Sequence, residues 1–302
     1  MLSAADARLS VVIATRNRRA RLLDTLPHHL TLPEQPRVVV VDDASTDGTA
    51  GALVAAHPRV EVVRLRSSLG GAARNEGVRV TTTPYVAFSD DDAWWRPGAL
   101  RMAADLLDAH PRLAVVQAHV LVGHDERDDV TCTQMRASPL RPIGDQPGCP
   151  ILSFVACAVV IRRTAFDECH GFSPRLAIGG EEELLSWDLA AAGWQLSYVP
   201  EIIAHHHPPP APGGRPLRRE TTIRNALWTA WLRRPAGAAT RATIRTLARA
   251  PRDRTTARAV RRAVAEGAWL VRERRVSPPS VEQMLRQLEQ QRPPFDGAES
   301  RR

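Results

Sequence analysis

The sequence predicts an α/β fold: a mainly parallel, Rossmann-like sheet flanked by helices, with a helical appendage at the C-terminus. Three observations predict it. Short apolar runs alternate with helical patterns through the first third of the chain. Runs such as the four valines at 38–41 show no polar alternation, which is typical of strands buried on both faces. Beyond residue 215 the apolar runs give way to Arg-rich helical patterns.

The elements of the first third follow from these runs. Each expected strand is short and apolar, and each expected helix has apolar residues spaced along one face. Pro97 suits the first turn of a helix, where its missing N–H costs nothing. We expect strands at 9–14, 38–41, 60–65 and 85–89, and helices at 18–30, 71–80 and 97–110.

The middle of the chain is less regular. The polar segment 123–150 is rich in Pro, Gly and Asp and indicates a long loop. Three Glu open a helix that Gly193 closes. The run HHHPPPAPGGRP, from His205, indicates a break in the fold. We expect strands at 113–122, 151–162 and 195–199, and helices at 181–192, 218–234, 238–250, 254–275 and 279–291.

These elements divide the chain into a main α/β domain over 1–214, an Arg-rich helical region over 215–292 and a disordered tail over 293–302. All 41 basic residues are Arg, and residues 215–302 hold 21 of them against 8 acidic residues, a net charge of +13. This asymmetry indicates an acidic partner, an anionic membrane or a nucleic acid, or else a solvated set of helices. No motif with base-stacking aromatics is present, so we do not expect nucleic acid.

The cellular setting is predicted from what the sequence lacks. The four Cys residues have no C-x-x-C spacing, so a zinc knuckle or redox pair is not indicated. No apolar run approaches the ~20 residues that span a bilayer. The N-terminal apolar run is too short for a secretory signal peptide. We therefore expect a cytoplasmic protein with at most peripheral membrane contact.

Polar residues stand at the ends of three expected strands. Ligands of open α/β sheets bind beyond the carboxyl ends of strands, so these residues form the candidate site. They are Thr15, Arg16 and Asn17 after the first strand, Asp42 and Asp43 after the second, and Asp90, Asp91 and Asp92 after the fourth.

Two clusters of carboxylates on neighbouring strand ends need compensation, because like charges that are buried together are costly. A divalent cation supplies it, and Mn²⁺ and Mg²⁺ both favour carboxylate oxygens completed by substrate phosphates. Such a metal neutralises charge that grows on a departing phosphate. The sequence thus predicts a Mn²⁺ or Mg²⁺ site at residues 90–92.

The chain resembles the family 2 glycosyltransferases of the GT-A fold over roughly residues 9–207. It carries, in order, the runs SVVIATRNR, VVVVDDASTDGT, GGAARNEG, YVAFSDDD, GGEEELL and GWQLSYVPEIIAHH. The DDxSxDGT and D-x-D runs together, at this spacing, are fairly specific. The resemblance implies a hexosyltransferase that transfers a sugar from a nucleoside-diphosphate sugar, a UDP- or dTDP-sugar, with inversion and with 1–214 as the catalytic domain.

The resemblance also implies roles for particular residues. It places the nucleobase and ribose among residues at the first two strand ends, with Asp43 better placed for the base, and Asp91 beside the ribose. Asp92 is the more direct metal ligand of the D-x-D pair, and a His after the last strand is a further ligand in some relatives. The nucleotide-sugar residues are then Thr15, Arg16, Asn17, Asp42, Asp43, Gly71, Arg74, Asp90 and Asp91, and the metal ligands are Asp90, Asp92, His205 and His207.

The acceptor hydroxyl needs a general base, which the family places in a Glu-Asp pair at a helix start. The matching residues are Glu181 and Glu182, so Glu182 takes the base position. Consecutive helical residues point about 100° apart, so the two cannot share one role. The alternative is that these acids only favour the helix dipole. Two residues depart from the family pattern: Glu182 replaces Asp, and Arg16 stands where an aromatic residue often stacks on the base.

Other readings stay open. A nucleotidyltransferase that makes sugar nucleotides would need a Gly-rich phosphate loop, and ATRNRRAR after the first strand lacks Gly. A non-catalytic nucleotide-sugar-binding protein would keep the aspartates without a base. The acceptor could be a natural product, a lipid-linked sugar or a glycan. The Arg-rich helices either dock on an anionic membrane or pack on the catalytic domain or on a second subunit, as in a homodimer, and His205 and His207 could belong to a solvated linker.

Overall fold

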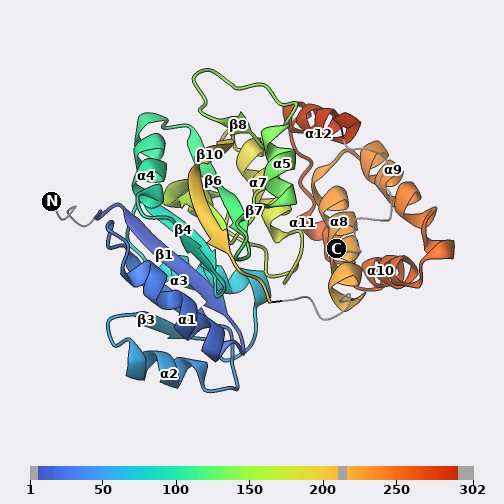
Figure 1. The fold of residues 1–302 in the computed structure, drawn as a ribbon. Helices are drawn as coiled ribbons and strands as arrows, with labels where there is room; N and C mark the ends of the chain where they lie inside the picture. Colours follow the sequence, from blue (N-terminus) through green and yellow to red (C-terminus); the bar gives the residue numbers. More distant parts are fainter. Residues whose placement is uncertain (1–5, 210–215, 292–302) are drawn as a thin grey trace.

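A computed structural model of the chain describes residues 6–209 and 216–291. Its described part contains one mixed, mainly parallel sheet in the order β3-β2-β1-β4-β9-β6-β10-β5, with β7 on β6 and β8 on β10 (Figure 1). The strands are β1 (Leu9–Thr15), β2 (Arg37–Asp42), β3 (Glu61–Arg64), β4 (Tyr85–Asp90), β5 (Ala93–Trp95), β6 (Leu113–Val122), β7 (Arg127–Asp128), β8 (Cys149–Pro150), β9 (Ala158–Arg162) and β10 (Gln195–His206). The predicted α/β class is confirmed.

The register of the parallel strands brings their carboxyl ends together. β1 lies between β2 and β4, and all three run in the same direction. Thr15 at the end of β1 is opposite Asp42 of β2, and Ala14 is opposite Asp90 of β4. The polar residues that follow these strands therefore meet at one edge of the sheet, where an α/β protein binds its ligands.

Helices cover the sheet because its strands are apolar on both faces. They are α1 (Arg19–Leu30), α2 (Thr49–Ala56), α3 (Ala73–Val80), α4 (Ala99–Ala109), α5 (Val130–Arg136), α6 (Arg163–Glu168) and α7 (Glu181–Ala191), with a 3₁₀ turn at Gly70–Ala72. The central strands β1, β4 and β9 are buried except at Ala14, Asp90 and Arg162, which are half-buried. A Cβ atom on Gly77 of α3 would lie 2.3 Å from Cγ1 of Val12, so a glycine allows α3 to lie close against β1.

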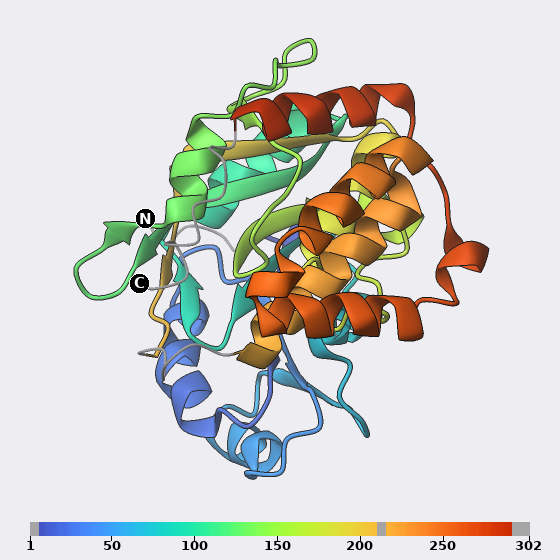
Figure 2. The ribbon, with the colours of Figure 1, turned by 90° about the vertical axis from the view of Figure 1, so that its right-hand side faces the viewer.

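The C-terminal helices pack together beside the sheet, as Figure 2 shows. Two apolar clusters join them to the rest of the chain. Trp228 of α8 packs with Leu184 of α7. Leu285 of α12 packs with Trp187, also of α7. The helices are α8 (Pro216–Arg233), α9 (Ala236–Leu247), α10 (Arg254–Ala265), α11 (Leu270–Glu273) and α12 (Pro279–Gln291), with a 3₁₀ turn at Ala250–Arg252.

The segment predicted as a loop at 123–150 holds a helix, and that prediction was wrong. Asp129 caps α5, since its carboxylate accepts a hydrogen bond from the Thr131 amide at 2.7 Å, and Cys132 and Met135 bury its inner face. The strand expected at 151–162 forms only from Ala158. The helical pattern of α5 was not recognised within the polar segment 123–150, because 7 residues are too few to repeat an apolar face.

Other boundaries shift for local reasons. β10 continues to His206, because β5 and β6 pair with it to its end, so the break predicted at His205 begins later. The helix expected at 254–275 is two helices, α10 and α11, separated near Gly267. α4 starts after Gly98, which has φ of +89°. The predicted tail at 293–302 lies outside the described residues.

None of the helices within 6–209 and 216–291 has the length and apolar character that a bilayer crossing requires.

Candidate active site

An arginine holds the aspartates that follow β4. Nη1 of Arg18 lies 2.7 Å from Oδ1 of Asp91 and 2.6 Å from Oδ2 of Asp92. Thr15, at the end of β1, donates its hydroxyl to the other oxygen of Asp91 at 2.8 Å. Both carboxylates are buried. Burial raises the pKa of Asp91 even though Arg18 and Thr15 oppose the shift. Arg18 thus neutralises part of the negative charge that the sequence predicted here.

Asp90 pairs with a second, buried arginine. Nη2 of Arg74, on α3, donates to Oδ1 of Asp90. Burial disfavours the charged form of Arg74, but Asp90, Glu182 and Glu181 together raise its pKa. Arg74 therefore stays a cation, and its charge interacts both with Asp90 at the end of β4 and with the two glutamates at the start of α7.

The two glutamates at the start of α7 lie beside this arginine. Glu181 is buried against Gly71, and its Oε2 has no hydrogen-bond partner among the described residues. Burial, and then the charge of Glu182, raise the pKa of Glu181. Burial also raises the pKa of Glu182, and the charge of Asp90 adds to the effect while Arg74 opposes it. Carboxylates with raised pKa values suit proton transfer near neutral pH.

The two aspartates after β2 have different environments. The Asp43 carboxylate accepts hydrogen bonds from the Ser68 hydroxyl and the Leu69 amide, both at 2.6 Å, and from the Gly70 amide at 3.1 Å. It thereby fixes the loop that leads to α3. Oδ1 of Asp42 accepts from the Ser45 amide, whereas its buried Oδ2 has no hydrogen-bond partner within the described chain. Asp42 thus keeps acceptor capacity that Asp43 has already used.

Asn17 joins the loops that follow β1 and β2. Its φ of +54° lies in the left-handed region, which Asn tolerates better than most residues. Its backbone amide donates to the Ser45 hydroxyl at 2.9 Å, and its side-chain Oδ1 accepts from the Thr46 backbone amide at 2.8 Å. Arg16, directly before it, is exposed. The structure therefore shows a loop-bridging contact for Asn17 and an open position for Arg16.

His206, which the sequence argument passed over, is the histidine beside the aspartates. Its Nε2 lies 3.3 Å from Oδ1 of Asp92. β5 pairs antiparallel with the end of β10, so that His206 is opposite Ala93, the residue after Asp92. Burial lowers the pKa of His206, but Asp92 reverses this and raises it. Because successive side chains of a strand point to opposite faces, His205 and His207 point away from the Asp92 carboxylate.

His205 and His207 contact an aromatic cluster. The ring of His205 stacks on Trp94 with centroids 5.4 Å apart, and His28 of α1 stacks on Trp94 at 4.4 Å. The ring of His207 lies 4.5 Å from Trp94. The backbone amide of His207 donates to the Asp92 carbonyl at 2.8 Å. Burial lowers the pKa of both histidines.

The site offers the chemical types of ligand atom that a divalent cation binds. Asp92 and His206 offer an oxygen and a nitrogen, which Mn²⁺ accepts, and substrate phosphates complete such sites. Over residues 6–209 and 216–291, however, no three His, Cys, Asp or Glu side chains are gathered as a ready-made cation site. In the arrangement described, Arg18 and Arg74 supply the positive charge.

The structure brings together most residues that the sequence argument selected, and their assigned roles stay predictions. Sequence reasoning missed Arg18 and His206. The position of Arg18 three residues after Thr15, at the end of β1, was the available signal. His206 could be separated from its neighbours only through the pairing of β5 with β10.

Comparisons with known proteins agree with this fold. The model of the family described as Glycosyl transferase family 2 matches residues 10–170. The chain is 32% identical over 209 residues to the pre-mycofactocin glycosyltransferase of Mycobacterium tuberculosis, a match that covers 66% of this chain and 43% of that protein. It is 25% identical over 206 residues to the N-acetylglucosaminyl-diphospho-decaprenol L-rhamnosyltransferase of the same species, covering 56% of this chain and 66% of the relative.

A solved structure has the same fold. The mannosyltransferase PcManGT from Pyrobaculum calidifontis, in complex with GDP-Man and Mn²⁺, superposes with a TM-score of 0.56 at 20% identity. The match covers 94% of this chain and 73% of that structure. The likeness confirms the expected GT-A type of architecture.

Proposed function

The chain belongs to glycosyl transferase family 2, and we propose that it is an inverting hexosyltransferase that uses a nucleoside-diphosphate sugar, most simply a UDP- or dTDP-sugar, and a divalent metal. The observation that carries the proposal is that one arginine, Arg74, interacts both with the acidic end of β4 and with the glutamates of α7. Asp90 hydrogen-bonds to this arginine, and the charges of Glu181 and Glu182 act on it. A donor held by the aspartates would present its sugar toward the glutamates.

The residues of the chain would divide the work of binding. Asp42 and Asp43 would take the nucleobase and ribose, with Thr15, Asn17 and Gly71 shaping the pocket. Asp42 is supported by its buried Oδ2, which accepts no hydrogen bond from the described residues and lies 4.0 Å from Nε of Arg64, whereas Asp43 is supported by the family position. Arg16 is exposed and offers a guanidinium plane to a base. Arg18 and Arg74 would balance the negative charge of the diphosphate.

Mn²⁺ or Mg²⁺, when bound, would stabilise the charge on the leaving diphosphate. Asp92 and Asp90 would hold it, and His206 is the histidine with the closest contact to Asp92. His205 and His207 remain candidates from the family pattern alone.

Glu182 would act as the general base. Its carboxylate would take the proton of the acceptor hydroxyl while the acceptor oxygen forms a bond to the anomeric carbon. The bond between that carbon and the phosphate oxygen would break, and its electron pair would leave with the nucleoside diphosphate. Burial raises the pKa of Glu182, and a carboxylate with a raised pKa is a stronger base for the proton of the acceptor hydroxyl.

The acceptor is proposed only as a class. The names of the relatives cite pre-mycofactocin in one case and a diphospho-decaprenol-linked sugar in the other. A natural product, a lipid-linked sugar and a glycan are therefore all to be offered as acceptors.

A donor panel tests the proposal. UDP-, dTDP- and GDP-sugars are incubated with the protein and Mn²⁺ or Mg²⁺, with and without acceptors, and products are read by mass spectrometry. Release of nucleoside diphosphate that needs Glu182 supports a glycosyltransferase. Pyrophosphate formation from a sugar phosphate and a nucleoside triphosphate would indicate a nucleotidyltransferase instead. Donor binding without turnover, unchanged in Glu182→Gln, would indicate a non-catalytic binding protein.

A further inference from the structure

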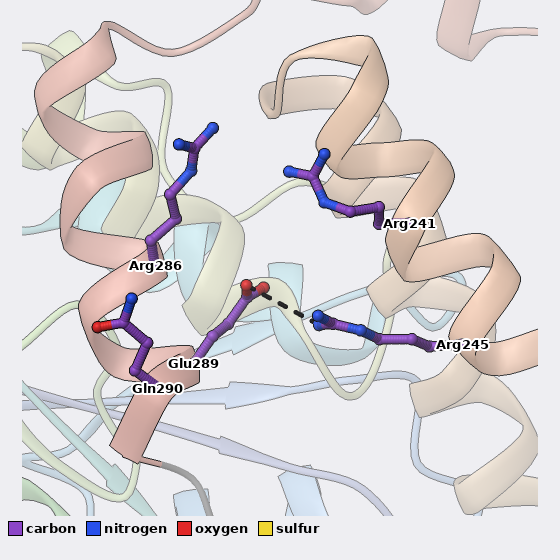
Figure 3. Close-up of a pocket in the computed structure, with 5 residues that line it drawn as sticks. All are labelled: Arg241, Arg245, Arg286, Glu289 and Gln290. Carbon is purple, nitrogen blue, oxygen red and sulfur yellow. Dashed lines mark ion pairs between the residues drawn. The ribbon is translucent and has the colours of Figure 1, made fainter.

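Five polar side chains line an open hollow of about 310 Å³ between two C-terminal helices. Arg241 and Arg245 come from α9, whereas Arg286, Glu289 and Gln290 come from α12. Figure 3 shows that the side chains of Arg241 and Arg286 extend into the gap between the helices. The volume equals that of about ten water molecules, which is enough for a diphosphate group.

Ion pairs to a buried arginine fix the side of α12 that faces the hollow. Arg234, between α8 and α9, is only 6% exposed. Its Nε and Nη2 lie 2.9 and 3.0 Å from the two oxygens of Glu282, and its Nη1 donates to Glu289. Both glutamates of α12 are thus already paired with the buried guanidinium of Arg234, which leaves less negative charge to balance the exposed arginines.

The exposed arginines of the hollow are therefore poorly compensated. Arg286 shares Glu282, with 3.1 Å between Nε and Oε1, and Arg245 reaches only to within 3.9 Å of Glu289. Arg241 has no carboxylate within ion-pair distance in the described part of the chain. Arg241 and Arg245 are also four residues apart on α9, where like charges repel. Two carboxylates serve four guanidinium groups here, so that two positive charges are in excess.

We propose that this hollow binds a phosphate-bearing anion, a phosphate monoester or a diphosphate, carried by a soluble molecule or by a lipid headgroup. Guanidinium groups are planar donors that match phosphate oxygens in pairs of hydrogen bonds. Gln290 adds a neutral donor at the rim. The anion relieves the repulsion between Arg241 and Arg245 and bridges α9 to α12. No residue of the hollow belongs to the candidate active site, so the inference is independent of the proposed function.

Calorimetric titration with inorganic pyrophosphate, without divalent cations, tests the site on the full chain. Arg241→Gln is the primary variant, because this residue makes no ion pair that folding needs. Arg241→Gln/Arg286→Gln removes both excess charges. The matched control, Arg258→Gln/Arg261→Gln, removes the same charge from exposed positions of α10. Any pyrophosphate bound at the active site is common to all four proteins.

We expect Arg241→Gln to weaken the pyrophosphate affinity of the hollow about tenfold, the double variant to remove this site, and the control to bind like the wild type. Equal binding by the wild type and the double variant would overturn the proposal. So would an equal loss in the control, because binding would then follow net charge alone.

Co-sedimentation identifies the source of the phosphate. Vesicles of phosphatidylcholine with phosphatidic acid are compared with phosphatidylcholine alone at low and moderate salt, since electrostatic binding weakens as salt rises. Loss of both vesicle and pyrophosphate binding in the double variant assigns the site to a lipid headgroup. Loss of pyrophosphate binding with unchanged sedimentation assigns it to a soluble phosphate.

Discussion

Nε2 of His206 lies 3.3 Å from Oδ1 of Asp92 and joins the last strand of the sheet to the aspartates that follow β4. The contact exists because β5, which begins directly after Asp92, pairs with the end of β10. It couples the acidic cluster to a segment more than 100 residues further along the sequence. Asp92, the predicted metal ligand of this pair, is the carboxylate on which metal dependence is tested first.

Asp92→Asn should remove most of the transfer activity. The amide keeps the shape but loses the charge that would hold a cation, and a Lewis-acid metal contributes several kcal/mol, or on the order of 10²-fold in rate or more. Nucleoside-diphosphate release is measured over a range of Mn²⁺ and Mg²⁺ concentrations. Asp24→Asn, at an exposed position of α1, is the control. Full wild-type activity in excess chelator would exclude the metal role.

Glu182→Gln should lower turnover by about 10²–10⁴-fold, because a positioned base contributes this much, while donor affinity changes little. Turnover and donor binding are measured separately for Glu182→Gln and Glu181→Gln. Glu201→Gln, exposed on β10, is the control. If Glu181→Gln is inactive and Glu182→Gln is normal, the base is Glu181 and the register of the assignment moves by one residue.

Glu181→Gln should make the stability of the protein less dependent on pH. The pKa of Glu181 is raised above its ordinary value of 4.5 on folding. Ionisation therefore costs more in the folded state, and stability falls as pH rises from the unfolded pKa through the folded one. The variant lacks this loss, so its gain over the wild type grows with pH and reaches on the order of 1 kcal/mol.

Denaturant unfolding at pH 4.5 and pH 8 gives the two free energies of unfolding. Glu201→Gln, at an exposed position of β10, is the control. A difference between Glu181→Gln and the wild type that is constant or that shrinks toward pH 8 would contradict the burial of an ionisable Glu181.

Gly71→Ala should lower activity by displacing Glu181. The added Cβ would lie 2.5 Å from Oε1 of Glu181, so the carboxylate must move. Gly51→Ala is the matched control, because a Cβ there meets no atom within 4 Å and Ala favours the helix by up to about 1 kcal/mol. Turnover and thermal unfolding are measured for both. Normal turnover in Gly71→Ala would mean that the position of Glu181 is not critical.

The sequence by itself determined the α/β class, the strands that end in polar residues and the family. An apolar run such as Val38–Val41 by itself indicates a buried strand. A motif such as Asp90–Asp92 can be recognised because its residues are consecutive in the chain. Local patterns also predicted most of the longer helices, although the short helices at Thr49–Ala56, Val130–Arg136 and Arg163–Glu168 were not predicted.

Only the tertiary structure decided which groups face one another. Three consecutive histidines look equivalent in sequence, yet strand pairing turns His206 toward Asp92 and its neighbours toward Trp94. The partners of the two site arginines were likewise not predictable from the sequence, since Arg18 pairs with residues 73 and 74 positions away and Arg74 with a residue 16 positions away. The physical reason is that burial and charge pairing depend on distances in space, which the register of the sheet sets and which local sequence does not record.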